Sequence, residues 1–81
     1  MIRLTLYGRR DCDLCHEMRA VVEAVIHDLP AVLEEVDVDT DPRLAARYGD
    51  EVPVLLVNGT PAFTVRVDAA ALRARLARTP G

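Results

Sequence analysis

Two cysteines three positions apart, Cys12 and Cys15, are the residues whose types and spacing can do chemistry. They follow a run in which apolar and polar residues alternate and precede a segment with helical spacing, so they should lie where a strand leads into a helix. The unpaired N–H groups and positive dipole at the first turn of a helix favour the thiolate, which is the nucleophilic form of cysteine. A second thiol one turn further on can close a disulfide over a short loop. The spacing therefore predicts a dithiol–disulfide couple.

The two sulfurs have different predicted roles. Cys12 is the candidate nucleophile that attacks a substrate disulfide, and Cys15 is the candidate that resolves the resulting mixed disulfide. Asp11 and Asp13 bring negative charge to either side of Cys12, and His16 lies four residues after it. These three residues are therefore candidates for tuning the thiolate through charge.

Two metal-containing sites are alternatives to the redox couple. Cys12 to His16 reads C-x-x-C-H, the attachment pattern of c-type haem, for which Met18 or His27 would be a second axial ligand. No export signal is visible, and a haem would need a large apolar pocket.

Zinc would need Cys12, Cys15, His16 and His27 together, but His27 lies about 18 Å along the helix from the thiols. We expect no metal site in one chain, which leaves only a cysteine-pair site shared by two chains.

Size and composition are typical of one small globular domain covering residues 1–81, because 51% of the residues are hydrophobic and 28% are charged. The net charge of −3 argues against a nucleic-acid partner. No apolar run approaches the roughly 20 residues that a membrane span needs, and the first residues read as a strand rather than a signal peptide. We therefore expect a cytoplasmic protein without a membrane partner, where cysteines are more often catalytic or metal-binding than structural.

Apolar periodicity, helix caps and turn residues predict seven elements in the order β-α-β-α-β-β-α. A right-handed crossover makes the first two strands parallel, and the Asn58-Gly59 turn makes the last two an antiparallel hairpin. Asp41 and Asp68 are predicted N-caps, and Gly49 is a predicted helix end. The simplest packing is a four-stranded mixed sheet with helices on both faces. The predicted strands are 2–7, 32–38, 52–57 and 63–67, and the predicted helices are 13–28, 43–48 and about ten residues after Asp68.

Two blocks of the sequence resemble the thioredoxin/glutaredoxin superfamily. They are the Cys12–Cys15 pair after the first strand and the stretch from Arg47 to Leu55, which reads RYGDEVPVL. The resemblance extends over nearly the whole chain, and short bacterial glutaredoxin-like proteins are the most similar. It implies a thioredoxin-like (glutaredoxin-like) α/β fold. It also implies that Pro53 is a cis-proline beside the cysteines and that the backbone of Val52 pairs with an extended substrate.

The resemblance also bears on glutathione as a co-substrate. Arg9 matches the position where many glutaredoxins carry a lysine, so it is a candidate substrate-binding residue. Asp13 stands where most glutaredoxins have proline, and Arg66-Val67-Asp68 stands where their glutathione site has paired glycines before an acidic residue. The resemblance therefore leaves glutathione use open, and Asp68 has a simpler role as a helix cap.

By this resemblance the protein is a monomeric thiol–disulfide oxidoreductase that reduces protein or small-molecule disulfides without a bound cofactor. Its electrons would come from glutathione or from a flavoprotein of the thioredoxin-reductase type. The alternative from another class is a non-catalytic thioredoxin-like binding module whose surface around Leu14 and Val52 docks a partner. Turnover of the Cys12–Cys15 couple with a reductase distinguishes the two.

Overall fold

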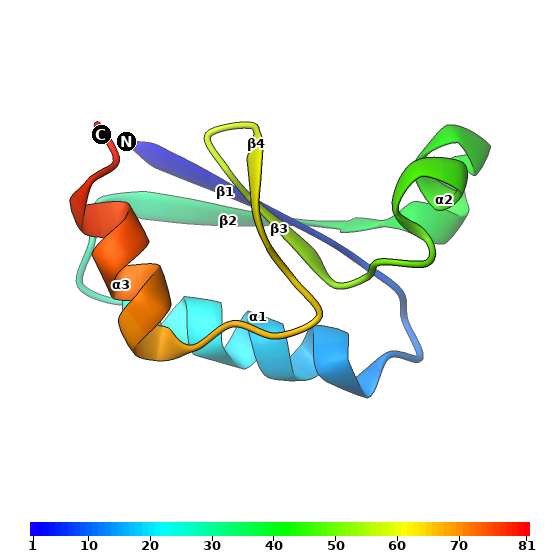
Figure 1. The fold of residues 1–81 in the computed structure, drawn as a ribbon, viewed down its shortest axis with the longest axis horizontal. Helices are drawn as coiled ribbons and strands as arrows, with labels where there is room; N and C mark the ends of the chain where they lie inside the picture. The colour runs from blue at the N-terminus through cyan, green and yellow to red at the C-terminus, as the bar shows by residue number, and fades with distance from the viewer.

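The computed structural model describes all 81 residues, and its element order confirms the predicted β-α-β-α-β-β-α arrangement. The four strands form one sheet in the order β2-β1-β3-β4 (Figure 1). β1 is parallel to β2 and antiparallel to β3, and β3 and β4 form the antiparallel hairpin. The elements are β1 (Ile2–Gly8), α1 (Asp13–Ile26), β2 (Ala31–Asp37), the short 3₁₀ helix η1 (Val38–Thr40), α2 (Pro42–Tyr48), β3 (Val54–Val57), β4 (Thr60–Thr64) and α3 (Ala69–Ala77).

The larger core lies between one face of the sheet and the helices α1 and α3; α1 runs along that face, and α3 lies at one end of it (Figure 1). Alternate residues of β1 and β3 point into it, and α1 contributes one apolar stripe, as the period of 3.6 residues requires. Each fully buried large side chain contributes about 1.5–3 kcal/mol. This core holds the start of α1, and so the cysteines, against the end of β1. Its members are Ile2, Leu4, Leu6, Met18, Val22, Val25, Leu55, Val57, Leu72 and Leu76.

The smaller core lies on the opposite face, under α2. Val38, Tyr48, Val54 and Leu56 are its buried members, and the Tyr48 ring stacks on Tyr7 with 4.6 Å between the ring centroids. Helices therefore lie on both faces, as predicted, but α2 covers only one end of its face (Figure 1). No helix is both long and apolar enough to span a membrane.

The last strand differs most from its predicted bounds of 63–67, because it begins directly after a two-residue turn. Asn58 and Gly59 both have positive φ, at 50° and 84°, and pairing resumes at once with Thr60 opposite Val57. Pro61 is tolerated there because β4 is an edge strand with a bulge nearby. The strand ends at Thr64 because Val65 has a φ of 69°, outside the extended region.

The other boundaries shift by one or two residues. β3 begins at Val54 rather than at residue 52, since Pro53 has no N–H to give to the ladder. α1 ends at Ile26 rather than at residue 28, and β2 begins one residue early, at Ala31. Gly49 ends α2 as predicted, although with ordinary helical dihedral angles rather than left-handed ones.

Candidate functional site

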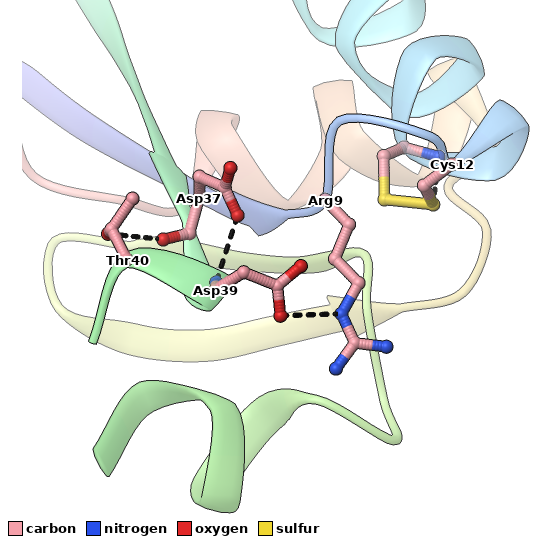
Figure 2. Close-up of polar contacts among 6 residues, drawn as sticks. Arg9, Cys12, Asp37, Asp39 and Thr40 are labelled. Carbon is pink, nitrogen blue, oxygen red and sulfur yellow. Dashed lines mark hydrogen bonds and ion pairs between the residues drawn. A yellow bond between two sulfur atoms is a disulfide. The ribbon is translucent and has the colours of Figure 1, made fainter. Parts of the chain in front are cut away.

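Cys12 and Cys15 form a disulfide at the N-terminus of α1, with their Cα atoms 5.2 Å apart (Figure 2). Cys12 is the N-cap residue, and its Sγ accepts a hydrogen bond from the backbone N–H of Cys15 at 3.1 Å. The Cys12 sulfur thus takes the place of the oxygen that usually caps a helix. Cys15 is only 5% exposed, whereas Cys12 is half-buried. An incoming group therefore meets Cys12 first.

Gly8 makes room for the buried sulfur, a role that the sequence interpretation missed. A Cβ built on Gly8 would lie 3.1 Å from Sγ and 3.2 Å from Cβ of Cys15, closer than ordinary van der Waals contact. The predicted strand stops at residue 7, whereas Gly8 is the last residue of β1 and is buried. A glycine at the end of a strand, a few residues before paired cysteines, is the signal that points to this close approach.

Pro53 lies next to Gly8 across the sheet. Tyr7 pairs with Val54 in antiparallel register, so the next residue pair outward is Gly8 and Pro53. The Val52–Pro53 peptide bond is cis. Neither the N–H nor the C=O of Val52 has a hydrogen-bond partner within the chain, so both are available to a bound segment. The structure thus brings Val52 and Pro53 to the end of β1 that meets the disulfide.

Leu14 lines a groove between α1 and the segment that joins β4 to α3. The groove has a volume of about 560 Å³, and its apolar lining includes Leu14, Val21 and Val65. Val65 is 43% exposed and sits in a three-residue turn, because Arg66 N–H donates to the Thr64 carbonyl at 2.7 Å. Left-handed φ is unusual for a β-branched residue and is often retained at functional sites. Nothing in the sequence predicts this turn.

Arg9 does not approach the sulfurs in this structure. Its Nε lies 3.3 Å from Oδ1 of Asp39, and the guanidinium extends toward η1 and away from the disulfide (Figure 2). Its Nη2 lies close to Gly49, where an added Cβ would be only 2.8 Å away. Arg9 therefore ties the loop that carries Cys12 to the segment before α2.

The three residues predicted to tune the thiolate, Asp11, Asp13 and His16, are all exposed, and none takes part in an ion pair. His16 is also held through its backbone, because its N–H donates to the Cys12 carbonyl at 3.1 Å. Because these side chains are exposed, solvent and salt screen their effect on the disulfide.

The structure contains no group of three or more His, Cys, Asp and Glu side chains that could hold a metal ion. Of the four residues counted as zinc ligands, Cys12 and Cys15 are bonded to each other, and His27 lies at the C-terminal end of α1. The helix therefore separates His27 from the cysteines.

Comparison with known proteins identifies the family. The profile of the glutaredoxin-like domain (DUF836) matches residues 3–77, and no curated protein matches the chain. The crystal structure of target protein XcR50 from X. campestris is 35% identical, with 95% of this chain and 99% of that chain covered and a TM-score of 0.76.

Two further structures extend the likeness. Protein Ne2328 from Nitrosomonas europaea is 29% identical over 91% of this chain and 89% of its own, with a TM-score of 0.78. A mutant thioredoxin from Halobacterium salinarum is 28% identical over 91% of this chain and 70% of its own, with a TM-score of 0.67. Together with the cysteine pair, these matches support a redox role of the thioredoxin type. The chain belongs to the glutaredoxin-like domain family, within the thioredoxin/glutaredoxin superfamily.

Proposed function

We propose that this protein is a dithiol–disulfide oxidoreductase that reduces protein or small-molecule disulfides. The observation that carries the proposal is the unequal exposure of two bonded sulfurs at a helix N-terminus. Cys12, half-buried at the N-cap, is placed to attack, and Cys15, buried behind it, is placed to resolve. The Cys15 N–H that points at the Cys12 sulfur stabilises its thiolate.

An extended substrate has a place to bind beside these sulfurs. The free N–H and C=O of Val52 can pair with the backbone of a segment that carries the disulfide. The groove beginning at Leu14 can receive an apolar side chain of the same segment. These two features support a peptide or protein disulfide as a substrate, and they also support binding without turnover as the second candidate.

Replacing each cysteine in turn tests the assignment. Cys12→Ser should abolish reduction of insulin or hydroxyethyl disulfide, because no nucleophile remains at the exposed position. Cys15→Ser should stop after the first step and accumulate a mixed disulfide on Cys12, visible as an added mass in intact-protein mass spectrometry. Unchanged turnover in both variants would exclude the oxidoreductase and leave the binding module.

Electrons are proposed to come from glutathione or from a flavoprotein of the thioredoxin-reductase type. Coupled assays with glutathione and glutathione reductase, or with NADPH and thioredoxin reductase, separate these donors. We expect the monomer to suffice, which size-exclusion chromatography of the active fraction tests.

A further inference from the structure

Cys15 also lines a second cavity, on the side of α1 that faces β2. This cavity has a volume of about 320 Å³ and lies between the start of α1 and the ends of β1 and β2. It is roomy enough for several waters, since a water occupies about 30 Å³ in the liquid. Because Cys15 is only 5% exposed, its thiol proton needs a route out before the sulfur can act as a nucleophile.

The strand register brings one carboxylate close to this sulfur. Gly8 pairs with Asp37 in the parallel ladder of β1 and β2, and neighbouring strands lie about 4.8 Å apart. Paired residues project from the same face of a sheet, and a Cβ on Gly8 would lie 3.1 Å from the Cys15 Sγ. Asp37 therefore projects from the same face of the sheet as Gly8, the residue against which the Cys15 sulfur packs. It also lines the same cavity as Cys15.

One oxygen of the Asp37 carboxylate accepts no hydrogen bond from the protein. Its Oδ1 accepts the N–H of Asp39 at 2.9 Å and so caps η1, while Oδ2 has no hydrogen-bond partner in the protein (Figure 2). The other acid in the cavity, Glu35, pairs with Leu6, two residues further from the sulfur, and its Oε1 lies 3.8 Å from Nε of Arg19. Asp37 is thus the better placed of the two carboxylates.

We propose that the Asp37 carboxylate accepts the Cys15 thiol proton through water in this cavity, an inference that rests on the proposed function. In the first step the Cys12 thiolate attacks a substrate disulfide, and one substrate thiolate leaves. In the second step the Cys15 proton passes to Asp37, and the Cys15 sulfur bonds to the Cys12 sulfur. The bond from Cys12 to the substrate breaks, the second substrate thiolate leaves, and Asp37 returns the proton to solvent. The dithiol thereby supplies two electrons.

Asp37→Asn is the decisive variant, because asparagine keeps an oxygen to cap η1 but cannot accept the proton. Reduced protein is mixed with hydroxyethyl disulfide, quenched with acid at set times, and resolved by mass into reduced, mixed-disulfide and oxidised forms. At pH 7 the variant should consume the reduced form at the wild-type rate but convert the mixed disulfide at least about tenfold more slowly. Above about pH 9, where solvent ionises the thiol, the two proteins should converge.

Glu35→Gln is the matched control, since it removes the same charge from the same strand and the same cavity. The proposal is overturned if Asp37→Asn slows the second step less than about tenfold at pH 7, or if the control slows it equally. If wild type forms neither the mixed nor the oxidised species, the proposed function itself fails instead. The other titratable or charged groups that line the cavity and contribute to the pH profile are Arg9, Arg10, His16 and Arg19.

Discussion

At the scale of single residues, the position of the buried sulfur depends on the missing side chain of Gly8. The Cys15 side chain occupies the space that a Cβ at Gly8 would need. Both residues are buried, Gly8 at the end of β1 and Cys15 in the first turn of α1. Close packing of this kind leaves neither backbone free to withdraw without disturbing the core beside it.

Gly8→Ala should therefore destabilise the oxidised protein by about 1–3 kcal/mol, the usual cost of overpacking. Urea unfolding followed by circular dichroism measures this change in the free energy of unfolding. Gly81→Ala is the control, because nothing lies within 4 Å of a Cβ at Gly81, and it should change stability by less than about 0.5 kcal/mol. Equal effects of the two substitutions would contradict the contact.

At the scale of elements, α3 depends on its cap. The Asp68 carboxylate accepts the N–H of Ala71 at 3.0 Å, and the helix that follows buries Leu72 and Leu76 against the larger core. Apart from the half-buried Ala69 and Arg75, the other residues of α3 are exposed, so the cap and these two leucines hold most of the helix in place. Asp68 thus has a structural role that needs no substrate.

Asp68→Ala should lower the free energy of unfolding by about 1 kcal/mol, because the N–H of Ala71 loses its partner. Asp68→Asn keeps an acceptor oxygen and should cost less than half of that amount. Thermal or urea unfolding measures both changes. A rise in KM for hydroxyethyl disulfide in the asparagine variant, without loss of stability, would instead show that the Asp68 charge serves the substrate.

At the scale of the whole molecule, the balance of charge around the disulfide favours a reducing protein. Asp11 and Asp13 flank Cys12 without ion pairs, and the Arg9 charge is turned toward Asp39. These two negative charges oppose formation of the Cys12 thiolate, and Arg10, which lines the cavity beside Cys15, offsets only part of them, so the reduced form is less stabilised. A less stabilised reduced form has a lower reduction potential.

We predict a potential between about −200 and −270 mV, the range of glutaredoxins and thioredoxin. Redox titration with iodoacetamide trapping measures it, and a value near −120 mV, that of a strong oxidant, would contradict the prediction. Asp13→Asn should raise the potential by about 20 mV at low salt. Asp28→Asn, just beyond the far end of α1, should change it far less at the same ionic strength, because the Asp28 carboxylate lies roughly 24 Å along the helix from Cys12 and a Coulomb interaction weakens with distance.

The fold of the whole molecule could be predicted from the sequence in part. Both acidic N-caps, Asp41 and Asp68, were placed correctly, and so were the Asn58-Gly59 turn and the edge position of β2. These signals are local, since each depends on a few neighbouring residues. The predicted bounds of β4 were wrong because the strand ends in a left-handed turn at Val65. Glycine and asparagine are the residues that usually indicate such a turn, and this turn contains neither.

The sequence by itself determined the paired sulfurs, the order of the elements and the asymmetry between an N-terminal and a buried cysteine, because spacing and periodicity encode them locally. Only the tertiary structure decided that Cys15 packs against Gly8, that Arg9 pairs with Asp39, and that Asp37 lines the same cavity as Cys15. These relations depend on strand register and on contacts between residues far apart in the chain. A shift of one residue in the register of β2 against β1 would move Asp37 to the other face of the sheet. No local sequence pattern predicts that register.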